Sequence, residues 1–270
     1  ALALQVRGLM NVQYVIAPAA QPGGPGVFVI EVNPRASRTV PFISKVTGVP
    51  MVRAAVEVML GKSLREQGLP NGLWPERDLV AVKAPVFSMA KLIGVDTFLG
   101  PEMKSTGEVM GVDYTFEPAV RKALIASDLA LRPGMPVLLS LADRTKTEAQ
   151  GLVETLHGAG CPLYATEGTA KFIADLGIPV QTVTKLLHEG HPNVVDVIRD
   201  RTVGAVVNTL EGGRASHMRD GFHIRRAATE NRVPCFTSID TARAAVQALT
   251  APDSYSVLPL ATYRDGARPA

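Results

Sequence analysis

From Val137 onward, short apolar runs alternate with helical patterns, and this alternation restricts the fold of the chain more than any other feature. The predicted strands cover 137–141, 161–165, 179–183, 203–208 and 233–236. The predicted helices cover 145–158, 168–176, 192–200, 222–230 and 240–249, the first with Thr145 and Glu148 spaced as a capping box. Strands that alternate with helices usually pair in parallel. The sequence therefore predicts an α/β fold with a doubly wound, five-stranded parallel sheet.

Polar residues follow the ends of four of these predicted strands. In such a sheet, ligands bind beyond the carboxyl ends of the strands, and a helix beginning just after Gly168 offers free N–H groups that favour phosphate. The residues concerned are Ser140, Lys146, Thr166, Thr169, Lys185, Asn208 and Thr209. The pattern indicates an anion-binding site without a catalytic acid–base pair. The alternative for each residue alone is a helix cap or a solvated charge.

Composition excludes several classes of protein. The 28 Lys and Arg residues are interspersed with 25 Asp and Glu residues, and only 5% of the chain is aromatic, so we expect no nucleic-acid binding. No run approaches the roughly 18 apolar residues of a membrane span. Cys161 and Cys235 have neither zinc-site nor disulfide-framework spacing and are predicted to be small buried thiols. We expect a cytoplasmic protein.

The pattern in the first part of the chain indicates a second candidate site, for a divalent metal ion. Residues 1–10 have the rhythm of the end of a helix, and two β-branched runs, 12–16 and 27–32, are joined by a turn-rich loop. If these strands pair, alternation brings the side chains of Gln13, Glu31 and Asn33 together. Oxygen donors of this kind suit Mg²⁺ or Mn²⁺. The alternative is a solvated strand face.

The residues that follow have a longer and more specific pattern. Residues 31–50, EVNPRASRTVPFISKVTGVP, resemble the sequence that closes an ATP-grasp domain in the carbamoyl phosphate synthetase large subunit, and residues 61–64 and 101–111 continue the resemblance. The resemblance implies that Gln13, Glu31 and Asn33 hold divalent ions that bridge the phosphates of ATP. It also implies that Arg35 and Arg38 face the transferred phosphate and the carboxylated substrate.

The last part of the chain resembles the methylglyoxal-synthase-like allosteric domain of the same subunit. The resemblance rests on LYATEGTAKF (163–172), KLLHEGHPN (185–193), VNTLEGGRA (207–215) and FHIRRA (222–227). It implies that the seven strand-end residues bind the phosphate of a nucleoside monophosphate effector, UMP or IMP. The chain has EGHP where methylglyoxal synthase has its catalytic GGD stretch, which argues against lyase activity. The chain departs from the pattern of this allosteric domain at two places: an extra residue separates Lys185 from His188, and Leu210 replaces a threonine. These departures bear on which effector binds, not on phosphate binding.

The sequence thus predicts three segments: 1–65, the end of an ATP-grasp domain; 66–130, a helical connector; and 131–262, the allosteric domain. The middle segment includes a short strand over 80–87 and a helix over about 116–129. The chain begins without Met and within a helical pattern, so we expect it to be a truncated piece of a longer protein and inactive by itself, since the ATP-grasp lid and adenine pocket would lie upstream.

The intact enzyme implied by the resemblance makes carbamoyl phosphate from ATP, bicarbonate and ammonia, for arginine and pyrimidine synthesis. The ammonia would come from glutamine through a glutaminase small subunit. A homo-oligomer is also expected. One alternative is a stand-alone regulatory module that senses nucleotides without catalysis; a less favoured one is a lyase of the methylglyoxal-synthase type.

Overall fold

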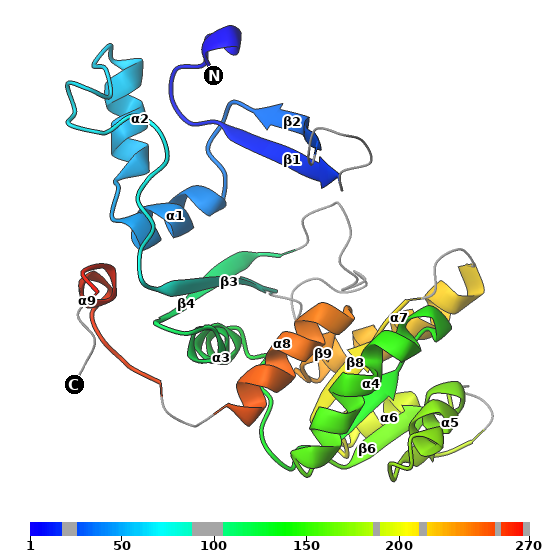
Figure 1. The fold of residues 1–270 in the computed structure, drawn as a ribbon. Helices are drawn as coiled ribbons and strands as arrows, with labels where there is room; N and C mark the ends of the chain where they lie inside the picture. The colour runs from blue at the N-terminus through cyan, green and yellow to red at the C-terminus, as the bar shows by residue number, and fades with distance from the viewer. Residues whose placement is uncertain (18–25, 88–104, 186–189, 211–214, 252–254, 267–270) are drawn as a thin grey trace. The chain divides into compact units, whose positions relative to one another are not determined.

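The computed structural model describes residues 1–17, 26–87, 105–185, 190–210, 215–251 and 255–266 (Figure 1). The chain forms two compact units. One contains residues 1–79 together with 258–270, and the other contains residues 80–257. The predicted loop between the first two strands lies largely outside the described residues. The division into 1–65, 66–130 and 131–262 remains a prediction about domains.

The second unit contains the predicted five-stranded, all-parallel sheet, and the fold class is confirmed. Its strands are β5 (Val137–Ser140), β6 (Leu163–Thr166), β7 (Gln181–Val183), β8 (Ala205–Asn208) and β9 (Cys235–Phe236). Their order across the sheet is β7-β6-β5-β8-β9. The strand of this sheet that comes first in the sequence, β5, therefore lies at its centre. The later strands are added on both sides of it.

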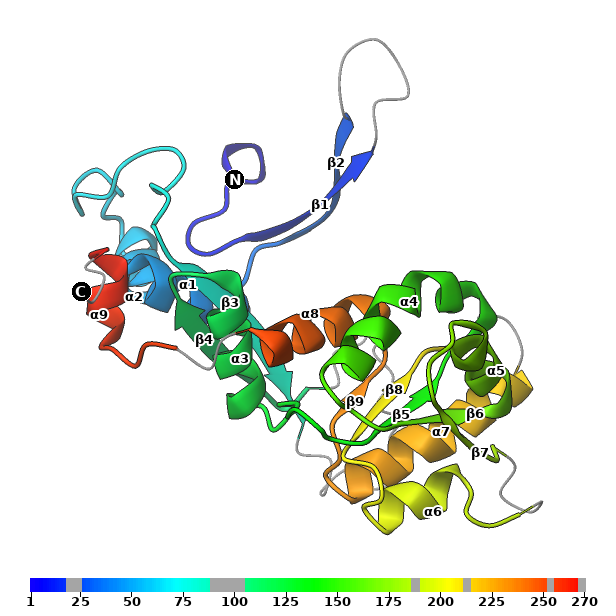
Figure 2. The same ribbon diagram turned by 60° about the horizontal axis from the view of Figure 1, so that its bottom comes forward.

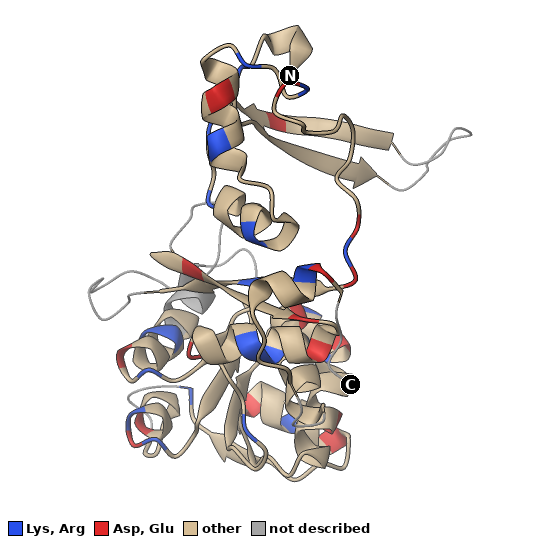
Figure 3. Cartoon of the chain, turned by 90° about the vertical axis from the view of Figure 1, so that its left-hand side faces the viewer, with Lys and Arg blue, Asp and Glu red and all other residues tan. Residues whose placement is uncertain are grey.

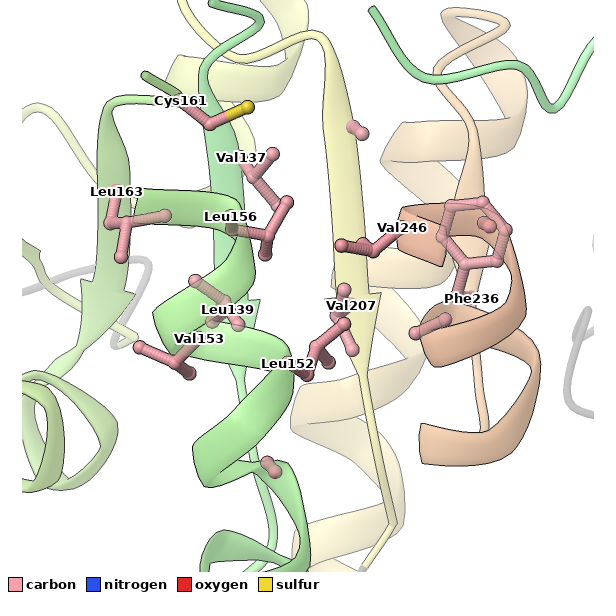
Figure 4. Close-up of a cluster of buried hydrophobic side chains, with 14 of the residues drawn as sticks. Val137, Leu139, Leu152, Val153, Leu156, Cys161, Leu163, Val207, Phe236 and Val246 are labelled. Atoms are coloured by element: carbon pink, nitrogen blue, oxygen red, sulfur yellow. The ribbon is translucent and has the colours of Figure 1, made fainter. Parts of the chain in front are cut away.

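Helices cover both faces of this sheet (Figure 2). One apolar cluster includes side chains from α4 (Asp143–Gly158), α5 (Glu167–Asp175) and α8 (Ile239–Thr250), and the other includes side chains from α6 (Val194–Arg199) and α7 (Ala215–Glu230). Successive residues of β5 belong to opposite clusters, since Leu139 packs with the first and Leu138 with the second. Figure 4 shows Leu139 near Val153 of α4. A strand buried on both faces explains the continuous apolar runs in the sequence.

The two cysteines differ in exposure. Cys161 is buried in the first cluster, and burial raises the pKa of its thiol, while Cys235 is only half-buried. Neither forms a disulfide, as the sequence predicts, but the predicted burial is confirmed only for Cys161 and is wrong for Cys235.

Three predicted helix starts are wrong, and one of them is that of α6, which begins at Val194 rather than at 192. The helix α4 begins at Asp143 with Ala142 as its N-cap, so the capping box predicted at Thr145 does not form. The hydroxyl of Thr145 instead donates to the carbonyl oxygen of Ala142, one turn earlier. The helix α7 begins at Ala215, before the apolar periodicity that starts at Phe222. Helix ends depend on local caps, which an apolar pattern does not specify.

The second unit also contains an antiparallel hairpin of β3 (Val80–Val86) and β4 (Gly107–Asp113), packed against α3 (Phe116–Ala126). Sequence reasoning predicts β3 and α3 but misses β4. Gly111 allows the close approach of α3 to β4, because a Cβ at this position would lie 2.0 Å from the carbonyl oxygen of Ala119. The guanidinium of Arg121 donates to the Ala248 carbonyl oxygen near the end of α8. These contacts make the hairpin part of the sheet unit.

The first unit contains the antiparallel strands β1 (Asn11–Ala17) and β2 (Gly26–Asn33), confirming the predicted pairing. Its helices are α1 (Thr39–Thr47), α2 (Met51–Met59) and the carboxyl-terminal α9 (Leu260–Arg264). A contact between α9 and α1 is a hydrogen bond from the Arg264 guanidinium to the Lys45 carbonyl oxygen. The predicted helix end over residues 1–10 is wrong: only a 3₁₀ turn forms, over Leu2–Leu4, and its leucines are exposed, so no packing stabilises a longer helix.

Basic and acidic residues are interspersed over the chain, and Figure 3 shows no large region of one sign. Among the described residues, no helix is long and apolar enough to cross a membrane.

The start of α6 provides a test of stability against pH. Asn193 and Asp196 form a capping box, in which the Asn193 N–H donates to the Asp196 carboxylate at 3.0 Å. This bond and the nearby His191 ring lower the pKa of Asp196. Because the folded-state pKa is lowered, the carboxylate stabilises the fold above its unfolded-state pKa of about 3.9, and the stabilisation disappears as pH falls through the folded-state value.

We therefore expect Asp196→Asn to lower the free energy of unfolding at pH 7, with a difference from wild type that shrinks as pH falls from about 5 towards 3. Urea denaturation over this range measures the effect. The control is Asp175→Asn, which replaces an exposed carboxylate at the end of α5 and should change little at any pH. A loss of stability that does not depend on pH would contradict the prediction.

Candidate functional site

The predicted anion site lies where the connections from two neighbouring strands diverge. The strands β5 and β8 pair at the centre of the sheet, with Ser140 opposite Asn208 at their carboxyl ends. The chain leaves β5 towards β6 on one side and leaves β8 towards β9 on the other. Doubly wound proteins bind ligands where the strand connections diverge in this way, and we refer to this place as the opening.

Five of the seven predicted residues are buried polar groups around this opening. They are Ser140, Thr166, Thr169, Asn208 and Thr209, of which Thr209 is the most exposed at 8%. The Thr166 hydroxyl is 3.5 Å from the Ser140 hydroxyl and 3.4 Å from the Thr169 hydroxyl. Buried polar groups are costly without partners. Three strand ends therefore contribute hydroxyl and amide groups to one small region.

Two of these threonines hold the loop that follows β5. The N–H of Leu141 donates to the Thr169 hydroxyl oxygen at 2.9 Å, and the N–H of Ala142 donates to that of Thr209 at 2.8 Å. The Thr209 oxygen is also 2.8 Å from the Thr145 hydroxyl oxygen. These side chains therefore fix the shape of the opening, whether or not they also contact a ligand.

Lys146 extends its ammonium group to the start of α5. Its Nζ would lie 3.4 Å from a Cβ on Gly168, in the first turn of that helix, and it forms an ion pair with Asp143 on α4. A helix N-terminus has unpaired N–H groups and a positive dipole end. An ammonium group beside it makes this position more favourable for an anion.

Lys185 follows β7 and is half-buried. Its backbone N–H is 3.4 Å from the side-chain oxygen of Glu167, the first residue of α5. The backbone at Lys185 therefore lies near the same helix start. The residues that follow it in the quoted motif, 186–189, lie outside the described residues.

Sequence reasoning missed two arginines at this site. Arg225 on α7 is only 1% exposed, and its Nη1 donates to Oδ1 of Asn208 at 2.8 Å. Arg144 on α4 donates through Nη2 to the carbonyl oxygen of Leu210 at 3.0 Å. A signal for Arg225 was present, because it lies on the same helical face as the apolar residues Ile224 and Ala228.

The predicted metal ligands share one face of the hairpin in the first unit. Gln13 is the cross-strand partner of Glu31, and Asn11 is the partner of Asn33. Directly opposite residues of paired strands point to the same side. The Asn33 amide also donates to the Glu31 carboxylate at 2.6 Å. The structure therefore places Gln13, Glu31 and Asn33 together.

Asn11 is a further polar residue on this face that sequence reasoning missed, although it lies two residues before Gln13. Its amide nitrogen donates to the Arg35 carbonyl oxygen at 3.2 Å, and its amide oxygen accepts from the Ser37 hydroxyl at 2.9 Å. Asn11 thereby ties the turn carrying Arg35 to the strand. Arg35 and Arg38 are both exposed, and Arg38 precedes α1 as its N-cap.

The donor chemistry of this face fits Mg²⁺ or Mn²⁺. Glu31 supplies a carboxylate, and Gln13 and Asn33 carry amide oxygens, all hard ligands. The bond from the Asn33 amide nitrogen to Glu31 leaves the Asn33 amide oxygen for another contact. The described part of the chain contains no group of three or more His, Cys, Asp or Glu side chains that could hold a metal ion, and this face is no exception, since its other two donors are amides.

The second unit also has a cavity of about 610 Å³ that none of the predicted anion-site residues lines. It is lined by residues of α3, α8 and the segment 255–256, with Asp113 among them. The Asp113 carboxylate already pairs with Lys122 at 2.9 Å and accepts from the N–H of Ser256. The Asp113 carboxylate in the cavity wall therefore already has its partners within the protein.

Comparison with known proteins relates both units to one larger protein. Residues 1–67 match the family model "Carbamoyl-phosphate synthase L chain, ATP binding domain", and residues 148–237 match the model "MGS-like domain". Over 265 residues, 98% of its length, the chain is 56% identical to the carbamoyl phosphate synthase large chain of Thermomicrobium roseum. It spans 24% of the length of that relative.

The loop contacts of Thr169 generate a stability prediction. Thr169→Val removes the acceptor of the buried Leu141 N–H, so we expect the free energy of unfolding to fall by about 1–3 kcal/mol. Thr169→Ser keeps the hydroxyl and should recover much of that loss. Urea denaturation measures both. The control is Thr155→Val, which removes only a hydrogen bond within α4. Equal losses for the valine and serine variants would show that the hydroxyl does not stabilise the loop.

Proposed function

Because this chain belongs to the family of carbamoyl phosphate synthase large chains and corresponds to their carboxyl-terminal part, we propose a regulatory role for its second unit. In this proposal the opening between β5 and β8 binds a nucleoside monophosphate, UMP or IMP, through its phosphate. The first unit contributes metal ligands to an ATP-dependent phosphorylation site of the longer protein. The chain alone is expected to turn over no ATP.

The observation that carries the regulatory proposal is the cluster of buried polar groups at the carboxyl ends of the strands. Hydroxyls and an amide from three strand ends meet beside the first turn of α5, where the Lys146 ammonium also lies. A phosphate dianion accepts several hydrogen bonds and is favoured by both the cation and the helix dipole. The Lys146 ammonium pairs with Asp143 and also lies beside this helix start, where it can contact an anion.

The number of donors is sufficient for useful affinity. Hydrogen bonds to a charged group contribute about 1.5–3 kcal/mol each. Micromolar binding requires about 8 kcal/mol, so a few such contacts suffice even after the cost of desolvation. Because the loop after β5 is held in place by Thr169 and Thr209, little further ordering is needed when the ligand binds.

For the first unit, we propose that the whole protein makes carbamoyl phosphate from ATP, bicarbonate and glutamine-derived ammonia, with a glutaminase small subunit as partner. Glu31, Gln13 and Asn33 would hold Mg²⁺ or Mn²⁺, which neutralises phosphate charge in phosphoryl transfer. Arg35 would face the transferred phosphate, with Arg38 beside it at the start of α1. The side chain of Asn11 bonds to the Arg35 carbonyl oxygen and the Ser37 hydroxyl, and so holds the turn that carries Arg35 against the strand. A homo-oligomer and a cytoplasmic location also remain proposals.

Calorimetry on the 270-residue chain tests the regulatory proposal. We expect UMP or IMP to bind with micromolar affinity and the corresponding nucleosides to bind at least tenfold more weakly, because the phosphate supplies most of the contacts. Lys146→Ala should weaken nucleotide binding about tenfold or more. The matched control is Lys171→Ala, which removes an exposed lysine from α5. Nucleosides that bind as tightly as monophosphates would refute the proposal.

Steady-state kinetics of the complete large chain with its small subunit test the metal proposal. Glu31→Gln keeps the shape of the side chain but removes the only carboxylate of the set, so we expect carbamoyl phosphate synthesis to fall at least a hundredfold. Bicarbonate-dependent ATP hydrolysis at the other phosphorylation site should be retained. Val29→Thr, at an exposed position on the same strand, is the control. Unchanged synthesis in Glu31→Gln would leave the three residues as a solvated strand face.

A further inference from the structure

The buried arginine on α7 contacts the end of β8, in the proposed phosphate site. Arg225 is 1% exposed, and its Nη1 donates to Oδ1 of Asn208 at 2.8 Å. A guanidinium group has only donors and keeps its charge at any ordinary pH. The atom of Asn208 that faces it is therefore the amide oxygen, and chemistry alone excludes the opposite orientation of the amide.

This orientation determines what Asn208 offers to a ligand. With its oxygen occupied by Arg225, the Asn208 amide nitrogen lies on the other side, where it donates to the Ser140 carbonyl oxygen at 3.3 Å. A side-chain amide nitrogen has two N–H groups. Among the described residues, no acceptor is found for the second one. Asn208 is therefore held as a donor, the role that an anion requires.

Gly221 makes this arrangement possible. It lies one turn before Arg225 on α7, and a Cβ at this position would be 2.5 Å from Nη1 of Arg225 and 3.1 Å from Oδ1 of Asn208. A methyl group here would occupy the space between guanidinium and amide. The side chain of Arg225 can bend back along its helix towards the strand end only because Gly221 has no side chain.

We infer that Arg225 is a positioning residue for the proposed phosphate site: it fixes the Asn208 amide with its N–H groups available to the anion and adds a buried positive charge behind it. The inference rests on the proposed phosphate binding in the second unit. Arg225 acts through Asn208, so we expect its replacement to lower anion affinity beyond any change in the stability of the fold.

Gly221→Ala is the most direct test, since it displaces the guanidinium without removing its charge. Alanine is a better helix former than glycine, so the stability of the chain should not fall for reasons of helix propensity. We expect calorimetry to show at least tenfold weaker binding of UMP and of inorganic phosphate. The matched control is Gly151→Ala in α4, where a Cβ would meet nothing within 4 Å, and its affinity should equal that of wild type.

Arginine variants provide a second comparison. Arg225→Gln should weaken phosphate binding, and Arg225→Lys should recover part of it because the positive charge returns. Arg226→Gln, which removes the adjacent arginine paired with Glu230 on the surface, should bind as wild type does. If wild type binds neither UMP nor phosphate, the proposed function fails. If wild type binds and Gly221→Ala binds equally well, only the positioning role of Arg225 fails.

A measurement on the unaltered chain covers the case in which the variants do not fold. In ¹⁵N-labelled wild type, the side-chain amide signals of Asn208 should shift as inorganic phosphate is added, with the same midpoint as calorimetry. Asn208 signals that stay unchanged when phosphate saturates the chain would overturn the inference.

Discussion

The pairing of β5 with β8 is the contact on which most of the second unit depends. Both strands are buried on both faces, and their last residues, Ser140 and Asn208, are polar groups that end side by side. Polar atoms in this position need partners within the protein. The neighbouring loops supply those partners, so the hydrogen bonds that satisfy the strand ends also shape the opening between the diverging connections.

The same requirement explains the role of residues at a distance from the strands. Thr169 on α5 and Thr209 after β8 accept the N–H groups of the loop after β5, and Arg225 on α7 donates to Asn208. A buried guanidinium costs free energy unless its donors are paired. Under the proposed function, an anion bound to the Asn208 amide would lie near the Arg225 guanidinium. Its negative charge would offset part of the free-energy cost of burying that group. The opening is thus held ready by contacts from both faces of the sheet.

In the first unit, strand register has the corresponding role. The pairing of Gln13 with Glu31 and of Asn11 with Asn33 collects four polar side chains on one face, and a shift by one residue would separate them. An irregularity in the ladder directly after Gln13 changes the partners beyond it. The four polar side chains therefore lie at the end of the hairpin next to Arg35. Asn11 links them to the turn that carries Arg35.

The sequence by itself determined the alternation of strands and helices, the parallel sheet, the hairpin and the list of residues at its strand ends, because apolar periodicity and strand alternation are local properties. It did not determine helix starts, the strand β4, or the partners of Arg225, Arg144 and Asn11. Those depend on which residues distant in the chain meet. That Arg225, on an apolar helical face, meets the Asn208 amide at 2.8 Å is seen only in the fold. Tertiary structure alone decided that contact, because a buried charge is stable only where a distant partner is present.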